Sequence, residues 1–399
     1  MNKEDKKNAI QAMLRRGHIQ EVISDHDMAE LLCGQSLRVK WGTDPTGKNI
    51  HLGRSIPIML LRDLQMLGHQ IVVVIGNFTA EIGDTSDKDC ERPAISGEAV
   101  FENMQTYIQQ IGKILDLNKT EFHFNKDWWS QMNFSRFVSM TDLFSLAEFS
   151  ARSNITKRLQ EGKRVSVREI IYPIMQGYDS LHLDADIEIG GTDQKFNMLA
   201  GRTIQRAYGK KAQSLIMTTL IDGLDGRKMS SSWGNTINLT DSPDDMLGKI
   251  MSMKDEMIVP YYIHLTRVPR ETIDEFTRRM AANEINPRDV KLDLAITIVA
   301  DLYDGGLAKK AAEAFKKVFQ QRELPEDMLS FQVKKTNIVD VLLEIGFANS
   351  RSAARRLIEQ GGVRIDGNKI SEFTVEIPDA CIIRKGKLHF ARVEKVSSS

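Results

Sequence analysis

Cysteine is scarce in this chain, and its few cysteines are far apart. Cys33, Cys90 and Cys381 are the only three among 399 residues, and none belongs to a C-x-x-C pair. This excludes a recognisable zinc knuckle and argues against a disulfide framework. We therefore expect no zinc and no other protein-bound metal.

The chain also lacks long apolar runs and an excess of charge of either sign. Its longest apolar run, at residues 71–75, is too short to cross a bilayer, and the polar N-terminus is not followed by the apolar core of a signal peptide. We expect a cytoplasmic protein with no membrane segment. The charges of the 54 basic and 54 acidic side chains cancel, so the chain as a whole does not attract nucleic acid. Any RNA binding must therefore come from a local basic surface.

The length predicts two or three domains, and the hydrophobic pattern predicts an α/β fold for the first of them. Residues 5–34 have a helical pattern with mixed charges. A short strand at 37–42, a turn at 44–47, a helix at 51–67 and a strand at 71–76 then form a βαβ unit. Such units build parallel sheets that bind ligands at the carboxyl ends of their strands.

Later segments predict the rest of the architecture. We expect strands at 121–124 and 186–189, separated by a helical insertion at about 126–165. The pattern is helical from 242 to about 325, a polar linker begins at 324–327, and a small α+β domain ends the chain. The predicted domains are 1–235, 236–330 and 331–399.

Residues 44–54 (DPTGKNIHLGR) have the composition of a phosphate-binding strand-to-helix turn. Backbone N–H groups and the helix dipole favour phosphate there. Thr46 and His51 would add donors, and Gly53 would allow close approach of an adenine. The alternative is an ordinary turn followed by a helix.

Lys228 lies in a glycine- and serine-rich segment, residues 225–235 (DGRKMSSSWGN), which is typical of a mobile loop. A lysine on a closing loop can neutralise charge that develops on a pyrophosphate leaving group, and so stabilise the transition state more than the ground state. The alternative is a solvated basic loop.

Tyr172, Gln176 and Asp179 fall on one face if their segment is helical. A phenol, an amide and a carboxylate facing a cleft can bind an amino group and a distal hydroxyl together. Buried groups of this kind discriminate strongly against an analogue without the hydroxyl. The alternative is a helix that starts near Pro173 and leaves Asp179 on the surface.

Together these segments resemble the bacterial tyrosyl-tRNA synthetases, a class I aminoacyl-tRNA synthetase family, over nearly the whole chain. The match covers residues 42–46, 51–53, 82–84, 125, 172–179, 190–197 (GGTDQKFN) and 228–232 (KMSSS), in the order and spacing of the family. It implies a Rossmann-like catalytic domain, an α-helical anticodon-arm domain and an RNA-binding domain. It also implies activation of L-tyrosine with ATP to tyrosyl-adenylate and pyrophosphate, followed by transfer to the 3′ end of tRNA(Tyr).

The resemblance implies a role for individual residues. Asp84, Tyr172 and Gln176 would hold the α-amino group, Asp179 would meet the phenol hydroxyl, and Asn125 would line the same pocket. The ribose and carboxylate side of the adenylate would be held by Asp193 and Gln194, with Asp44 nearby. The ATP phosphates would be handled by Thr46, His51 and Lys228, with Gly53 and Ser231 also in the ATP site and Mg²⁺ arriving with ATP.

Two positions depart from the family pattern. Arg54 ends the first motif, residues 44–54, where the family usually has a second histidine. We expect Arg54 to be a catalytic residue as well, although its longer, planar guanidinium group changes the geometry. Lys40 stands where some members have a second phenol-binding tyrosine. The sequence leaves open whether Lys40 contacts substrate.

The C-terminal segment resembles an RNA-binding domain shared with a ribosomal protein. Ser350 is placed to cap a helix that carries Arg351, Arg355 and Arg356 on one edge. Residues 331–399 contain 12 Lys or Arg and 8 Asp or Glu, a net charge of about +4. We predict RNA binding at these three arginines.

Two other functions compete with a tyrosine:tRNA ligase. A tryptophan enzyme would share the Tyr-Pro…Asp helix, but Gln176, residues 192–197 and the RNA domain favour tyrosine. A non-catalytic RNA-binding paralogue is favoured only by Arg54. The resemblance also implies a homodimer with the helical insertion, around 140–165, at its interface.

Overall fold

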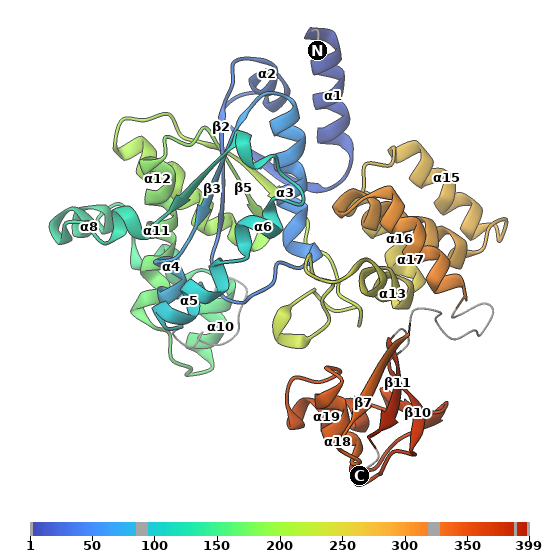
Figure 1. Cartoon of the computed structure of the whole chain (residues 1–399). Helices are drawn as coiled ribbons and strands as arrows, with labels where there is room; N and C mark the ends of the chain where they lie inside the picture. Colours follow the sequence, from blue (N-terminus) through green and yellow to red (C-terminus); the bar gives the residue numbers. More distant parts are fainter. Residues whose placement is uncertain (1–2, 85–94, 318–327, 387–388, 397–399) are drawn as a thin grey trace. The chain divides into compact units, whose positions relative to one another are not determined.

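The computed structural model describes residues 3–84, 95–317, 328–386 and 389–396. The chain separates into two compact units (Figure 1): Met1–Thr240 with Met253–Leu294, and Asp241–Ser252 with Ala295–Ser399. Cys90 and the expected linker at 324–327 lie outside the described residues.

A six-stranded sheet forms the centre of the first unit. Its strand order is β1-β6-β5-β2-β3-β4, with every neighbouring pair parallel except β1 and β6. The strands are β1 (Ile19–Ile23), β2 (Arg38–Thr43), β3 (Gln70–Ile75), β4 (Thr120–Phe124), β5 (Ile187–Gly191) and β6 (Ser214–Thr218). The predicted parallel α/β sheet is confirmed.

Helices cover both faces of this sheet. Figure 1 shows α3 on one side and α11 and α12 on the other. The helices around the sheet are α1 (Lys3–Arg15), α2 (Met28–Cys33), α3 (Leu52–Met66), α4 (Thr79–Ile82), α5 (Gly97–Met104), α6 (Tyr107–Ile111), α11 (Val167–His182) and α12 (Lys195–Ala207). Because both faces are covered, β3 is buried along Ile71–Ile75 and reads as a continuous apolar run.

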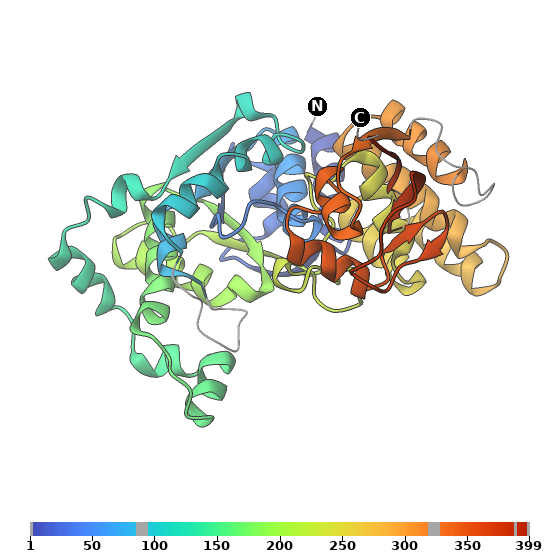
Figure 2. The ribbon, with the colours of Figure 1, turned by 60° about the horizontal axis from the view of Figure 1, so that its bottom comes forward.

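The helical insertion is confirmed as four short helices. They are α7 (Lys126–Trp129), α8 (Phe134–Thr141), α9 (Leu146–Ser150) and α10 (Ser153–Gln160). Figure 2 shows the last two, in green, projecting away from the sheet. Phe134 and Leu146 are 78% and 67% exposed in this chain, so the insertion presents apolar surface.

Helix α11 starts at Val167, earlier than in the alternative prediction, which placed the start of the helix near Pro173. Ser166 and Glu169 form a capping box at its N-terminus, so Pro173 lies inside the helix and not in its first turn. Helix α12 packs so closely against α11 that a Cβ atom on Gly177 would lie 2.8 Å from the backbone nitrogen of Gly201. On the other side of α11, Asp179 is 4% exposed.

The prediction for residues 5–34 was partly wrong. Helices α1 and α2 are present, but β1 lies between them as an edge strand. It pairs only with β6, and its side chains alternate between half-buried and exposed. A five-residue strand exposed on one face carries polar residues that hide its pattern. Strand β6 itself was not predicted from the sequence.

The remaining helices are those expected after residue 242. They are α13 (Pro243–Ser252), α14 (Ile258–Leu265), α15 (Arg270–Ala281), α16 (Pro287–Leu302) and α17 (Gly305–Lys316). Helices α14 and α15 belong to the first unit, α13 and α17 to the second, and α16 continues from one unit into the other. None of the helices in the described ranges is both long and apolar enough to cross a membrane.

The second unit contains the expected small α+β fold. Its sheet order is β7-β11-β10-β8-β9, with β7 (Leu329–Val333), β8 (Val363–Ile365), β9 (Asn368–Lys369), β10 (Ala380–Lys385) and β11 (His389–Lys395). Helices α18 (Ile338–Glu344) and α19 (Arg351–Glu359) share one apolar core with this sheet. Ala354 and Ile358 are buried in that core and Leu357 packs against it.

A buried histidine makes the stability of the first unit depend on pH. His18 is 4% exposed, and neither ring nitrogen has a hydrogen-bond partner among the described residues. Burial, and then the positive charges of Arg267 and Arg16, lower the pKa of His18 to about 3. The unfolded chain therefore binds a proton that the folded chain does not, once the pH falls below about 6.5.

We predict that His18 lowers the free energy of unfolding by about 2 kcal/mol between pH 7 and pH 5. Above pH 6.5 His18 is neutral in both the folded and the unfolded chain, and the folded state keeps its full stability. As the pH falls from 6.5 toward 3, only the unfolded chain takes up the proton, so the free energy of unfolding decreases. Urea unfolding at pH 7, 6 and 5 should show a shallower pH dependence in His18→Leu. The exposed His26→Leu variant should keep the parental slope; equal slopes in all three proteins would contradict the assignment.

Candidate functional site

A cavity of about 520 Å³ lies in the first unit, at the carboxyl ends of the parallel strands. It forms where the chain leaves β2 on one side and β5 on the other, as expected at a topological switch point. All of the predicted catalytic, substrate-binding and ATP-binding residues line it: Asp44, Thr46, His51, Gly53, Arg54, Asp84, Asn125, Tyr172, Gln176, Asp179, Asp193, Gln194, Lys228 and Ser231.

Residues 44–54 and 225–235, called the two signature segments below, lie next to each other although they are far apart in sequence. The backbone N–H of Leu52 donates to Ile237 O at 2.8 Å, and that of Leu239 donates to Ile50 O at 2.8 Å. The backbone N–H of Gly53 also lies 3.3 Å from the Met229 sulfur. The start of α3 and the loop carrying Lys228 therefore form one wall of the cavity.

His51 is a neutral hydrogen-bond donor at the N-terminus of α3. Burial, followed by the positive charges of Arg54 and Lys228, lowers its pKa to about 3. Its Nδ1 accepts from the backbone N–H of Arg54 at 3.3 Å. A neutral imidazole that accepts at Nδ1 carries its proton on Nε2, so this nitrogen can donate to a ligand oxygen.

The loop with Lys228 is held in shape by Asn235, which is 4% exposed. Asn235 Nδ2 donates to Asp225 Oδ1 at 2.7 Å, and the backbone N–H of Ser230 donates to Asn235 Oδ1 at 2.9 Å. Lys228 Nζ lies 3.3 Å from Asp193 Oδ2 and remains about one third exposed. The lysine is thus presented to the cavity and still accessible.

Asp44 is fixed by two hydroxyl donors. Tyr172 Oη donates to Asp44 Oδ2 at 2.9 Å and Thr79 Oγ1 donates to Asp44 Oδ1 at 2.8 Å. A Cβ atom at Gly76 would lie 2.0 Å from the same Oδ1, so only glycine fits beside this carboxylate. Across the cavity, Gln194 Nε2 donates to Asp84 Oδ2 at 2.7 Å.

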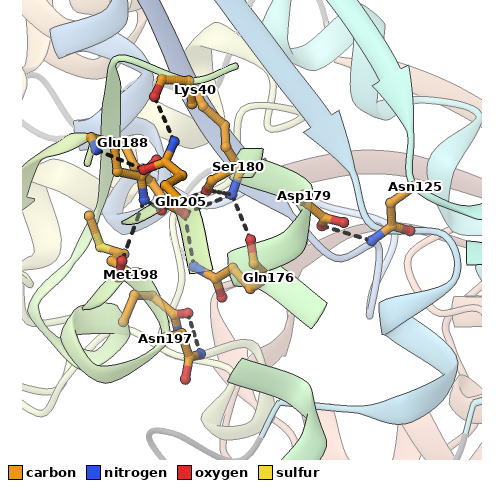
Figure 3. Close-up of polar contacts among 12 residues, drawn as sticks. Lys40, Asn125, Gln176, Asp179, Ser180, Glu188, Asn197, Met198 and Gln205 are labelled. Atoms are coloured by element: carbon orange, nitrogen blue, oxygen red, sulfur yellow. Dashed lines mark hydrogen bonds and ion pairs between the residues drawn. The ribbon is translucent and has the colours of Figure 1, made fainter. Parts of the chain in front are cut away.

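Asp179 occupies a dry, hydrogen-bonded position in the wall of the cavity. Its Oδ1 accepts from the indole N–H groups of Trp128 and Trp129, both at 2.8 Å. Its Oδ2 accepts from Asn125 Nδ2 at 3.2 Å, the contact drawn in Figure 3. Burial raises the pKa of the Asp179 carboxyl, and the positive charge of Lys40 and these donors oppose that rise. The prediction that Asp179 faces a cleft and not the solvent is confirmed.

Sequence reasoning missed several residues that shape the cavity. Thr79 holds Asp44, Trp128 and Trp129 hold Asp179, and Glu188 lies in the wall beside Lys40. The tryptophan pair follows Asn125 by only three and four residues, which was the one local signal. Thr79 and Glu188 carry no motif, and only the packed sheet brings them to the site.

The predicted RNA-binding residues lie in the second unit. The Ser350 side chain caps α19 by accepting from the Ala353 N–H, as expected. Arg351, Arg355 and Arg356 are all exposed on that helix. Arg351 pairs with Asp340 on α18 at 2.7 Å, so its charge is partly neutralised, whereas the Arg355 guanidinium lies 5.8 Å from the centre of the Phe373 ring.

Two family models match the chain. The model described as "tRNA synthetases class I (W and Y)" matches residues 33–320, and the S4 domain model matches residues 337–376. The first match contains the whole cavity, and the second contains α18 and α19.

Curated relatives match the chain over almost its full length. It is 42% identical to the tyrosine–tRNA ligase of Thermotoga maritima, over 96% of this chain and 97% of that protein. It is 40% identical to the tyrosine–tRNA ligase of Mannheimia succiniciproducens, over 97% of this chain and 98% of that protein.

Solved structures share the fold at lower identity. A truncated mitochondrial tyrosyl-tRNA synthetase from Coccidioides posadasii superposes with a TM-score of 0.64 at 21% identity, covering 78% of this chain and 96% of that one. The tyrosyl-tRNA synthetase of Archaeoglobus fulgidus, solved with L-tyrosine, gives 0.61 at 22% identity, covering 78% of this chain and 100% of that one.

Proposed function

The chain belongs to the class I tRNA synthetase family of the tryptophan and tyrosine enzymes, and we propose that its cavity is where tyrosine and ATP react. The protein is a tyrosine–tRNA ligase: it activates L-tyrosine with ATP to tyrosyl-adenylate and pyrophosphate, and transfers the tyrosyl group to the 3′ end of tRNA(Tyr). The observation that carries the assignment of the pocket is the buried Asp179, held beside the same cavity as the two signature segments.

The phenol hydroxyl of tyrosine is recognised by Asp179 in this proposal. A carboxylate has about four lone-pair sites, and the three hydrogen bonds from Trp128, Trp129 and Asn125 leave room for one more donor. Phenylalanine has no such donor, so its ring would cover Asp179 and leave the carboxylate buried without its fourth partner. This cost gives selectivity for the hydroxyl.

The α-amino group of tyrosine is assigned to Asp84, Tyr172 and Gln176. Asp84 supplies a negative charge, held in place by Gln194, and the other two supply neutral oxygens. Tyr172 already donates its proton to Asp44, which leaves its oxygen free to accept from an ammonium group.

ATP is assigned to the wall made by the two signature segments. Thr46, the His51 Nε2 proton and the N-terminus of α3 offer donors to phosphate, with Arg54 as a further cation. Asp44, Gly53, Asp193 and Ser231 complete the ATP site. We take Mg²⁺ to enter with ATP as part of the substrate, and the described residues contain no group of three or more His, Cys, Asp or Glu side chains placed to hold a metal.

The chemistry requires positioning and charge stabilisation only. The tyrosine carboxylate attacks the α-phosphorus, the bond to the bridging oxygen breaks, and pyrophosphate leaves with that electron pair. Lys228 approaches the leaving pyrophosphate by exchanging its contact with Asp193 for one with phosphate oxygen. An interaction formed mainly in the transition state raises the rate of activation.

We propose the three domains 1–235, 236–330 and 331–399 as functional divisions, with tRNA(Tyr) bound by the last two. The exposed Arg355 and Arg356, with Arg351 beside them, supply the basic edge of α19. A cytoplasmic homodimer is also proposed, and the exposed Phe134 and Leu146 of the helical insertion support an interface there.

We predict that the protein catalyses tyrosine-dependent ATP–pyrophosphate exchange and discriminates against phenylalanine. Replacing Asp179 with Asn should reduce that discrimination about 10- to 100-fold, because a hydrogen bond to a charged group is lost. The measurement is the exchange rate with tyrosine, phenylalanine and tryptophan. Exchange with tryptophan alone would indicate a tryptophan enzyme, and none with any of the three would indicate a non-catalytic RNA-binding protein.

For Lys228→Ala we expect tyrosine-dependent adenylate formation to slow by about 10²- to 10³-fold, with tyrosine affinity nearly unchanged. Stopped-flow kinetics and equilibrium binding separate the two quantities. Arg227→Ala is the matched control, because Arg227 is on the same loop but does not line the cavity. Equal losses of rate and affinity in Lys228→Ala would assign the lysine to ground-state binding.

Reversing the charge of both Arg355 and Arg356 to Glu should raise the KM for tRNA(Tyr) by about tenfold or more, because phosphate contacts become repulsive. The exchange reaction needs no tRNA and serves as the internal control, with an unchanged rate. Aminoacylation that is insensitive to this double change would remove the RNA-binding role of α19.

A further inference from the structure

A buried ion pair lies in the wall of the cavity between the sheet and α11. Lys40 on β2 is opposite Glu188 on the neighbouring strand β5, and their side chains are 1% and 2% exposed. Lys40 Nζ lies 2.9 Å from Glu188 Oε1. Both residues line the cavity, with Gln176 of α11 beside them (Figure 3).

Every proton of the Lys40 ammonium has a protein acceptor. Nζ donates to Glu188 Oε1 at 2.9 Å, to Ser180 Oγ at 2.7 Å and to the backbone oxygen of Gln176 at 3.1 Å. An ammonium group has three donors, so these three bonds use all of them. Lys40 therefore shapes the cavity without offering a donor to the ligand.

Glu188 in turn decides how the Gln176 amide is oriented. Glu188 Oε1 accepts from Gln176 Nε2 at 3.1 Å, and Oε2 accepts from Ser180 Oγ at 3.1 Å and from Gln213 Nε2. A carboxylate can only accept, so Gln176 must turn its NH₂ group toward Glu188. Its Oε1 then points away from Glu188 and remains an acceptor at the edge of the half-buried side chain.

An apolar pair of similar volume could fill the same space. Burying two charges costs several kcal/mol per ion before their attraction is counted, and apolar replacements of buried pairs are often neutral or stabilising. Packing alone therefore does not require Lys40 and Glu188. What an apolar pair could not do is hold the Gln176 amide in one of its two orientations.

We propose that Lys40 and Glu188 are positioning residues that turn Gln176 Oε1 toward the α-amino group of the substrate. The inference rests on the proposed function, in which Gln176 receives that ammonium group. Glu188 orients the amide, and Lys40 supplies the counter-charge that keeps Glu188 an acceptor. With the wrong orientation, the Gln176 NH₂ group would face an ammonium group, and donor would meet donor.

The test compares two ligands that differ only at the group in question. L-Tyrosine has the ammonium group, and 3-(4-hydroxyphenyl)propanoate lacks it while keeping the ring, the phenol and the carboxylate. In Glu188→Gln the side chain at 188 can donate as well as accept, so the Gln176 amide is free to turn over. Calorimetric titration should show about tenfold weaker binding of tyrosine and less than a twofold change for the analogue.

A second variant tests whether the loss of affinity comes from misfolding. Lys40→Met combined with Glu188→Gln removes both charges, so neither is left buried without its partner. It should show the same selective loss of tyrosine affinity. Glu169→Gln is the matched control, because it breaks the other described ion pair whose two side chains are both below 5% exposed, Arg158 with Glu169, away from the cavity lining. The ratio of the two affinities should not change there.

The outcomes separate the two proposals. If the parent protein fails to bind tyrosine or to support exchange, the proposed function is wrong. If the parent binds tyrosine but the variants lose both ligands equally, Lys40 and Glu188 only stabilise the fold and the positioning role is overturned. A selective loss for tyrosine in both variants supports it.

Discussion

The site depends on the position of β2, which is hydrogen-bonded to β3 on one side and to β5 on the other. The chain runs outward from β2 through β3 to β4, and from β5 to β6 in the opposite direction. This reversal separates the connections that leave the two central strands and opens a cavity at their carboxyl ends. The same pairing places Lys40 directly opposite Glu188.

Around this opening, polar side chains are held by other protein groups before any ligand binds. Asp179 is held by two indoles and an amide, Asp44 by two hydroxyls, and Glu188 by an ammonium and three further donors. Charges that are already desolvated and oriented do not have to reorganise when the substrate arrives.

Much of the fold could be predicted because its elements carry strong local patterns. Helix α3 and strand β3 have long apolar faces, and α11 is long enough for its three polar residues to be aligned correctly. The edge strand β1 was mistaken for helix because only one neighbour and one face define it. Its short sequence contains Glu21 and Gln20, which hide the alternation.

The sequence by itself determined the turn at 44–54, the loop with Lys228 and the polar face of α11, because short-range spacing sets each of these segments. Its resemblance to a known family added Asp84, Asn125, Asp193 and Gln194. Only the tertiary structure decided which partners hold them. Thr79, Trp128 and Glu188 reach their partners across 35, 51 and 148 positions of sequence, and hydrogen bonds over such separations depend on strand order and helix packing. These long-range contacts have no periodic signal, because burial of the whole unit selects them.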